Sequence, residues 1–176
     1  MNVLFVCTGN ICRSPTAERL AAAYAAEEGM LDFTASSAGT RAVIGHPIHP
    51  DAAIALRELG GDASDFAARQ LKSKIASDAE LIITMTGAHR DAVLEAAPRQ
   101  LKRTFTLTEA AQLASMDGAD TLADLAALRP HLTANDMADV RDPIGQSPEV
   151  FATISAQIAA LLPPVLELCR RSPART

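Results

Sequence analysis

A cysteine, an arginine and a serine near the start of the chain have types and spacing that suit chemistry on a phosphate group. They lie in the segment Cys7-Thr8-Gly9-Asn10-Ile11-Cys12-Arg13-Ser14. A cysteine thiolate is a strong nucleophile, and the planar guanidinium of arginine can bind two phosphate oxygens at once. The spacing alone is weak evidence, because Cys169 and Arg175 share it. The context of the first copy distinguishes it, since it joins a predicted strand to a predicted helix.

The strand is the apolar run Val3–Val6, and the helix is predicted to begin at Ser14 as its N-cap. Gly9 and Asn10 suit a tight loop that needs unusual backbone angles. A loop that turns into a helix N-terminus gathers unpaired N–H groups around one point, and the helix dipole adds partial positive charge. Such a field attracts an anion and favours the thiolate form of Cys7. The segment therefore predicts phosphoryl transfer through a cysteinyl-phosphate, with Ser14 able to donate a hydrogen bond to the thiolate.

This reaction also needs a proton donor for the leaving oxygen, and residues 139–145 (DVRDPIG) offer candidates. Asp142 is the preferred one, because the proline after it stiffens the loop and the glycine at position 145 lets the loop turn. Asp136 and Asp139 are the alternatives.

Strands and helices alternate along the chain, which is typical of a parallel α/β sheet with crossover helices. We expect one domain over residues 1–171 and a frayed tail over 172–176. The expected strands are Val3–Val6, Phe33–Ala38, Leu81–Met85 and Thr104–Leu107. The expected helices cover residues 14–30, 50–59, 88–97, 109–115, 120–128 and 148–162, with Pro163-Pro164 breaking the last one before a short helix that ends near Cys169.

Composition narrows the function classes. The 176 residues carry a formal charge of −5, which argues against a general nucleic-acid binder. No run approaches 18 consecutive apolar residues, so we expect no membrane span. Met1 leads directly into the first strand with no signal-like segment, and three cysteines cannot all pair, so a cytoplasmic, reduced protein is expected. The four histidines are scattered without zinc spacing, so no metal or cofactor is expected, and a monomer is favoured.

The segment VLFVCTGNICRSPTAE closely resembles the phosphate loop of low-molecular-weight protein tyrosine phosphatases. The similarity continues through Ser37-Ala38-Gly39-Thr40, Arg69-Gln70-Leu71, LIITM and Asp142-Pro143. It implies a three-layer, flavodoxin-like domain with four parallel strands in the order 2-1-3-4, acting on phosphotyrosine in proteins. It also implies roles for individual residues: Cys7 as nucleophile, Arg13 as phosphate clamp, Asp142 as general acid and then base, Thr8, Gly9, Asn10, Ile11, Cys12 and Ser14 as the phosphate loop, and Asn10, Ser14 and Ser37 as the residues that hold this loop rigid.

Three departures from the family pattern stand out. The aromatic residues that usually follow the Asp-Pro pair are replaced by Ile144 and Gly145. The histidine that commonly supports the loop asparagine is replaced by Phe66. The stretch 108–141 is longer than expected and reads as a helical insertion before the acid loop. We expect this insertion to pack beside the cleft and to replace the missing aromatic wall.

The sequence allows two interpretations of the role of each of three further residues. Ile11 suits an aromatic ring, whereas a threonine stands at this position in related arginine phosphatases; alternatively, Ile11 packs on the body of the domain. Cys12 can form a reversible disulfide with the nucleophile in this family, or it is a small buried hydrophobe. His89 opens a helix, where structural support is expected rather than contact with substrate.

Two rival functions remain open. An arsenate reductase of the same fold would need two further cysteines to relay a disulfide, and only Cys169 lies downstream of the loop. An inactive module that binds phosphate or phosphopeptides would be expected to lack the nucleophile, the clamp or the acid. All three are present here, but the altered residues after Asp142 keep this alternative open.

Overall fold

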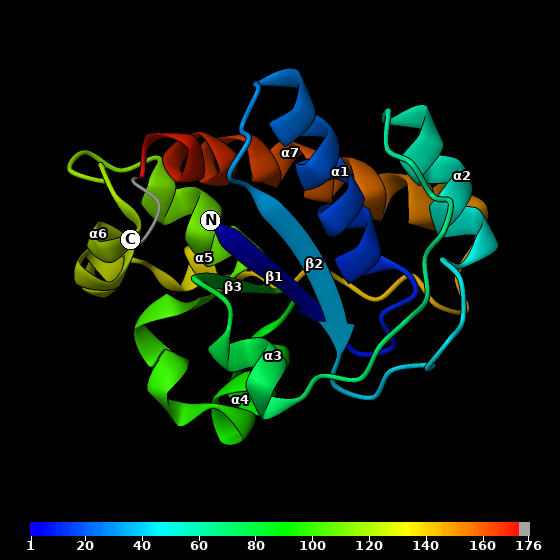
Figure 1. The fold of residues 1–176 in the computed structure, drawn as a ribbon, viewed down its shortest axis with the longest axis horizontal. Coiled ribbons are helices and arrows are strands. Elements are labelled where there is room, and N and C mark those ends of the chain that lie inside the picture. Colours follow the sequence, from blue (N-terminus) through cyan, green and yellow to red (C-terminus); the bar gives the residue numbers. More distant parts are fainter. Residues whose placement is uncertain (173–176) are drawn as a thin grey trace.

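The protein is described here by a computed structural model, which covers residues 1–172, with side chains throughout that range except at positions 135 and 137. Four parallel strands form one sheet in the order β2-β1-β3-β4, as the resemblance implied (Figure 1). The strands are β1 (Asn2–Cys7), β2 (Thr34–Gly39), β3 (Leu81–Thr84) and β4 (Thr104–Thr106). In the register, Cys7 at the end of β1 lies opposite Gly39 at the end of β2, so the loops that follow these strands meet at one edge of the sheet.

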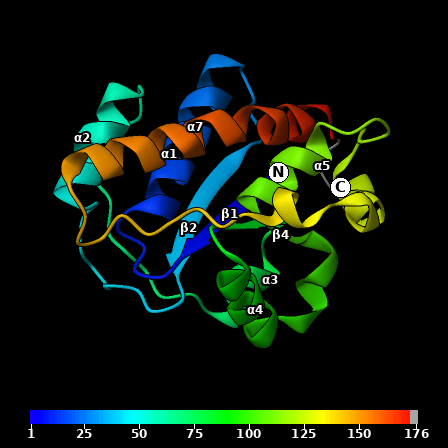
Figure 2. The same cartoon turned by 180° about the vertical axis from the view of Figure 1, so that it is seen from behind.

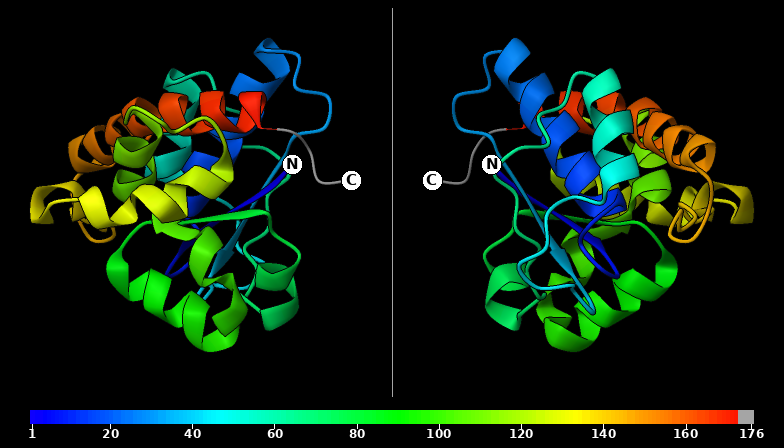
Figure 3. Two further views of the ribbon diagram at one scale, coloured as in Figure 1. Left: turned by 90° about the vertical axis from the view of Figure 1, so that its left-hand side faces the viewer. Right: turned by 90° about the vertical axis from the view of Figure 1, so that its right-hand side faces the viewer.

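Helices cover both faces of the sheet and make the three layers predicted (Figure 3). One face carries α1 (Arg13–Glu27), α2 (Pro50–Glu58), α5 (Leu107–Ala114) and α7 (Pro148–Arg171), and the other carries α3 (Ser73–Ser77) and α4 (Gly87–Ala96). Successive side chains of β1 point to opposite faces of the sheet, so the strand contributes to a separate part of the core on each face. Val3 and Phe5 pack with α1, α5 and α7, whereas Leu4 and Val6 pack toward α3 and α4.

The N-cap of the first crossover helix lies two residues before its expected position. Cys12 is the N-cap of α1, so the prediction that Ser14 caps this helix is wrong. The Ser14 side chain is completely buried and bonds to Cys7 instead. The hydrogen bond to Cys7, within the predicted phosphate loop, takes this hydroxyl out of the capping role that its sequence position suggested.

The long stretch before the acid loop is helical, as expected, but it lies elsewhere. It contains α5, α6 (Leu122–Leu128) and two 3₁₀ turns, η2 (Arg129–His131) and η3 (Ala134–Met137). The α6 segment packs against α5 and against η1 (Pro98–Arg103), which leads into β4. A cavity of about 700 Å³ is lined by part of α6 and by Met1 and Glu80, which precede β1 and β3. Seen from behind, α7 crosses α1 on one face of the sheet, and α3 and α4 lie on the other (Figure 2).

These contacts place α6 at the amino edge of the parallel sheet, whereas the phosphate loop follows the carboxyl end of β1. Residues 122–128 therefore do not line the cleft, and the expectation that the insertion over 108–141 replaces the aromatic wall is wrong for this part of it. The physical reason is the anchoring of this segment: Arg129 donates to the carbonyls of Leu101 and Thr104, and its guanidinium stacks 4.2 Å from the ring centroid of Phe105.

The last helix continues through both prolines, contrary to the predicted break. Each proline removes a main-chain hydrogen bond, at a typical cost of about 3 kcal/mol in a helix interior. Here the side chains flanking the prolines are buried against the core, including Leu162, Val165 and Leu166, and this packing holds the helix together. Of the described helices, only α7 is long and apolar enough to cross a bilayer, but its buried face packs on α1, α2 and α5.

The remaining differences are small. The strand expected over Thr104–Leu107 ends at Thr106, where a capping box with Glu109 starts α5 at once. The short helix α3 was not expected. The predicted frayed tail over 172–176 lies, apart from Ser172, outside the described residues.

Candidate active site

The predicted phosphate loop curls around its own N–H groups because a second segment takes up its carbonyls. The N–H groups of residues 40–49 donate to this loop at four positions: Thr40 to Cys7, Arg41 to Thr8, Val43 to Gly9 and His49 to Ile11, at 2.7–3.0 Å. Within residues 1–172, the N–H groups of residues 8–12 have no acceptor. Carbonyls bound by a second segment and N–H groups left without acceptors are the pattern expected of an anion-binding cradle.

Asn10 is the residue that fixes this curl. Its φ of 56° is left-handed, a conformation that asparagine tolerates, and Gly9 beside it needs no positive φ. The side chain is completely buried and makes three hydrogen bonds. Its Nδ2 donates to Ser14 Oγ at 2.9 Å and to Ser37 Oγ at 2.8 Å, and its Oδ1 accepts from Arg69 N at 2.9 Å. Asn10, Ser14 and Ser37 therefore form one network, as the resemblance implied.

The same network orients a hydroxyl toward Cys7. Ser14 Oγ lies 3.0 Å from Cys7 Sγ, and both side chains are buried. Because Ser14 already accepts from Asn10, its own hydrogen is free to be donated to the sulfur. A hydroxyl donating to sulfur stabilises the thiolate and makes the sulfur a better leaving group.

Arg13 connects the loop to the segment that holds the candidate acid. Its guanidinium, only 4% exposed, donates from Nη1 to Val140 O at 3.0 Å, and its Nη2 lies 2.9 Å from Asp142 Oδ2. The Nε of Arg13 is buried without a partner among residues 1–172. Two sites 129 positions apart in sequence thus meet, and one N–H of the predicted phosphate clamp remains available.

Of the three candidate acids, only Asp142 contacts the loop. Asp139 accepts a hydrogen bond from Gly87 N at 2.9 Å. Asp136 bonds to the main chain and hydroxyl of Thr133, and these bonds lower its pKa. The geometry agrees with the preference for Asp142 over both alternatives.

Glu18 supports the loop from behind, a role that sequence reasoning missed. Ser37 Oγ donates to its Oε2, so this hydroxyl is left to accept from Asn10. Burial raises the pKa of Glu18, while the Ser37 hydrogen bond and the charges of Arg19 and Arg69 act in the opposite direction. The only sequence signal was a glutamate one residue beyond capping-box spacing, which pointed to the helix rather than to the loop.

Phe66 occupies the position where the family commonly has a supporting histidine. A phenylalanine cannot donate a hydrogen bond to Asn10 as a histidine could. Its ring instead lies against Arg19, whose guanidinium is 5.5 Å from the ring centroid. Arg19 in turn lies 3.4 Å from the carboxylate of Glu18. A cation over an aromatic ring therefore flanks the carboxylate that orients Ser37.

His89 also contacts the loop, and this contact is compatible with the structural support expected from the sequence. Its Nε2 lies 2.8 Å from Thr8 Oγ1, and its Nδ1 is buried without a partner among residues 1–172. Burial, with a smaller effect of Arg13, lowers the pKa of His89 to about 4, against the opposing charges of Asp139 and Asp142. The imidazole is therefore neutral near pH 7.

A glycine permits the close approach of the segment that binds the loop carbonyls. A Cβ added at Gly39 would collide with the carbonyl oxygen of Thr8 and would press on Ala42. Gly39 also accepts from Leu71 N and donates to Arg69 O. This position joins the ends of β1 and β2 to the Arg69–Leu71 segment.

Exposed aliphatic side chains occur in the segments next to the loop. Ile144, after the acid, is 46% exposed, and Val43 and Ile44 are 38% and 69% exposed. Ile11 is partly exposed and flanks Gly9 together with Val43. The aromatic stack between His49 and Phe151, at 4.7 Å, involves the α2 and α7 region instead of the acid loop.

A family model for the low molecular weight phosphotyrosine protein phosphatases matches residues 2–120. A protein named as a probable low molecular weight protein-tyrosine-phosphatase, EpsP of Ralstonia nicotianae, is 34% identical over 110 residues, which are 62% of this chain and 72% of that protein.

Solved structures extend the likeness to almost the whole fold. A low molecular weight protein tyrosine phosphatase from T. tengcongensis matches with a TM-score of 0.75 and 30% identity, over 95% of this chain and 98% of that chain. The arginine phosphatase YwlE, in a mutant with a phosphorylated active-site serine, matches with a TM-score of 0.78 and 27% identity over 97% of each chain. The matched region contains the strand, loop and helix that carry Cys7 and Arg13, and the chain belongs to the low molecular weight phosphotyrosine protein phosphatase family of hydrolases.

Proposed function

We propose that this protein hydrolyses phosphotyrosine in proteins through a cysteinyl-phosphate intermediate and without a metal ion. The observation that carries the proposal is the meeting of Cys7, Arg13 and Asp142 around a loop with unpaired N–H groups. This arrangement supplies a nucleophile, an oxyanion cradle and a proton donor at one place.

In the first step, Cys7 Sγ attacks phosphorus while Arg13 and the loop N–H groups bind the three non-bridging oxygens. The bond from phosphorus to the phenolic oxygen breaks, and Asp142 gives its proton to that oxygen. In the second step, the Asp142 carboxylate takes a proton from a water molecule, which attacks phosphorus and releases phosphate. Ser14 stabilises the departing thiolate through the hydrogen bond to Sγ.

The proposed preference for phosphotyrosine over phosphoarginine rests on the aliphatic side chains beside Gly9. The matched relatives include a tyrosine phosphatase and an arginine phosphatase, so family membership alone does not choose between them. Ile11 and Val43 present apolar surface beside Gly9, which suits a phenyl ring better than a charged guanidinium.

Ile11→Thr should shift this preference. We expect the ratio of kcat/KM for a phosphotyrosyl peptide to that for a phosphoarginyl peptide to fall by about tenfold or more, the scale of changing one apolar contact in a pocket. The measurement is the release of phosphate from two peptides that differ only in the phosphorylated residue.

The matched control is Ile54→Thr, which makes the same change at an exposed isoleucine of α2. An unchanged ratio in Ile11→Thr would favour the alternative that Ile11 only packs on the domain. A ratio that already favours phosphoarginine in the wild type would overturn the proposed substrate.

Cys12 makes oxidation of the nucleophile reversible in this proposal. Peroxide converts the Cys7 thiolate to a sulfenic acid with release of hydroxide, and the Cys12 sulfur then displaces water to form a disulfide. Burial, together with the negative Cys7 and Asp142, raises the pKa of Cys12 to about 12, so this sulfur stays a thiol until the disulfide forms.

We therefore expect peroxide treatment to give a Cys7–Cys12 disulfide detectable by mass spectrometry, with activity restored by dithiothreitol. Cys12→Ser should lose most of this recovery, and Cys169→Ser should retain it. Full recovery without a Cys7–Cys12 bond would show that Cys12 is only a buried hydrophobe.

Arsenate reduction is disfavoured by the place of the third cysteine. Cys169 is 3% exposed near the end of α7, and burial raises its pKa to about 12. It lies near Met1 and the amino edge of the sheet, opposite the phosphate loop. A disulfide relay from Cys7 to Cys169 would have to cross the core.

Cytoplasmic location and protein substrates complete the proposal. All three thiols are free in the described chain, which suits a reducing compartment. A phosphotyrosine-containing protein is the partner proposed, with no nucleic acid, and the enzyme is proposed to act as a monomer.

A further inference from the structure

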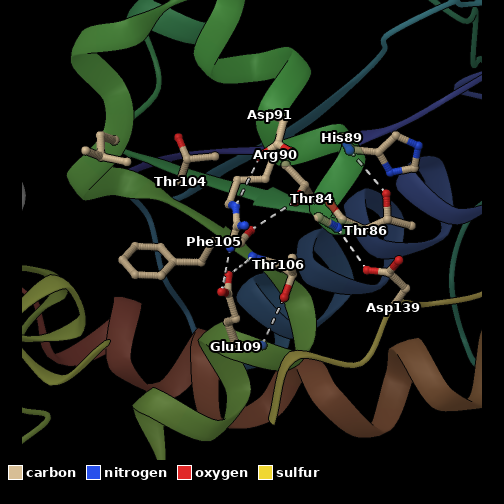
Figure 4. Close-up of polar contacts among 12 residues, drawn as sticks. Thr84, Thr86, His89, Arg90, Asp91, Thr104, Phe105, Thr106, Glu109 and Asp139 are labelled. Atoms are coloured by element: carbon tan, nitrogen blue, oxygen red, sulfur yellow. Dashed lines mark hydrogen bonds and ion pairs between the residues drawn. The ribbon is translucent and has the colours of Figure 1, made fainter. Parts of the chain in front are cut away.

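One short segment contacts both loops of the candidate active site. It is the junction between β3 and α4, residues 85–89. Met85 O accepts from Val140 N at 2.8 Å. Gly87 N donates to Asp139 Oδ1 at 2.9 Å, and the carboxylate of Asp139 lies beside Thr86 at the start of α4 (Figure 4). His89, from the first turn of the same helix, bonds to Thr8 of the phosphate loop. The junction is therefore a shared support for the nucleophile loop and the acid loop.

We propose that Asp139 is a positioning residue that holds Asp142 where it can protonate the leaving group, an inference that rests on the proposed function. Val140, directly after Asp139, is completely buried and fixed on both sides: its N–H donates to Met85, and its carbonyl accepts from Arg13. Arg13 also binds the Asp142 carboxylate. The hydrogen bond between Asp139 and Gly87 thus anchors the segment that leads through Val140 to Asp142.

The contact is suited to a carboxylate. Gly87 is the first residue of α4, where main-chain N–H groups lack partners within the helix and the helix dipole favours negative charge. The N-cap Thr86 satisfies the N–H of His89 but not that of Gly87. Asp139 takes the remaining N–H and ties the acid loop to the helix that also carries His89.

Asp142 and Asp139 therefore have different roles. Asp142 lies against the guanidinium that is to bind phosphate, whereas Asp139 Oδ1 is engaged by α4 on the other side of Val140. Asp139 does not contact the phosphate loop, so it acts through the place that it gives to Asp142.

The experiment compares kcat/KM for aryl phosphates from p-nitrophenyl phosphate to phenyl phosphate. The dependence of kcat/KM on the leaving phenol reports on the protonation of that phenol as it leaves. Asp139→Ala should be about tenfold slower on phenyl phosphate, short of the hundredfold that an ångström-scale misplacement can cause, and little changed on p-nitrophenyl phosphate. Asp139→Asn keeps an acceptor oxygen for Gly87 and should restore near-normal values.

Three further variants sharpen the result. Gly87→Pro removes the donor while leaving Asp139 intact, since proline is well tolerated at the first helical position and Thr86 already has the extended conformation favoured before proline. It should reproduce the loss of phenyl phosphate hydrolysis seen in Asp139→Ala. The double variant Asp139→Ala/Gly87→Pro should lose no more of this activity than either single variant. Asp136→Ala removes a carboxylate from the same segment and should leave the leaving-group dependence unchanged.

Equal losses on all esters in Asp139→Ala would mean a general structural effect and would overturn the proposal. Asp139→Asn as slow as Asp139→Ala, or additive losses with Gly87→Pro, would overturn it as well. Melting temperatures of all variants identify any that fail to fold. Failure of the proposed function is distinguishable, because the wild type itself would then hydrolyse none of the esters.

Discussion

Cys7→Ser will abolish turnover of p-nitrophenyl phosphate in metal-free buffer, with a loss of about 10⁴-fold or more, as expected when an enzyme loses its nucleophile. A serine hydroxyl at this position is a far weaker nucleophile than a thiolate. The side-chain hydrogen bond of Cys7 among the described residues is with Ser14, whose hydroxyl is not a base that could activate the new serine. The assay is the release of p-nitrophenol by wild type and variant, side by side.

The variant should still bind inorganic phosphate, because the loop N–H groups and Arg13 are unchanged. Calorimetric titration with phosphate supplies this control and shows that the loop is intact. Comparable turnover in both proteins would contradict a cysteinyl-phosphate mechanism. Phosphate binding without turnover in either protein would support the inactive phosphate-binding module instead.

Asp142→Ala will slow phenyl phosphate hydrolysis, measured as kcat/KM, by about 10²–10⁴-fold, the usual contribution of a general acid. The loss on p-nitrophenyl phosphate should be much smaller, because p-nitrophenolate leaves readily without a proton. Plotting kcat/KM against the acidity of the leaving phenol gives the measurement, and the slope should become steeper in the variant.

The same substitution should tighten the binding of inorganic phosphate. Asp142 Oδ2 lies 2.9 Å from Arg13 Nη2, so the carboxylate competes with a bound anion for the guanidinium. The control is Asp136→Ala, whose carboxylate bonds to Thr133 and not to Arg13. Equal losses on all esters would argue that Asp142 is not the acid.

The sheet and the phosphate loop could be predicted from sequence because their signals are local. Val3–Val6 is an apolar run between polar neighbours, and the Cys7-to-Ser14 segment carries its chemistry within eight positions. Asp142 was found by the proline after it. In each case, the residues that give the signal are the residues that form the structure.

What sequence reasoning missed depends on contacts between distant segments. Glu18 orients Ser37, and Asp139 bonds to Gly87, 52 positions away. Their partners are set by strand order and register, which no single stretch of sequence contains. Pro163 and Pro164 are a strong local signal to end α7, but the helix continues because the buried side chains next to them pack against distant segments.

The separation of the two sheet edges makes one region open to engineering. Residues 117 and 118, between α5 and α6, are exposed at the edge opposite Cys7, and Gly118 already adopts a turn conformation with φ of 86°. A fluorophore or an affinity tag attached there stays remote from the reacting groups. The same addition within residues 40–49 would displace the N–H groups that hold the phosphate loop, so the two edges offer, respectively, a handle and a means of inactivation.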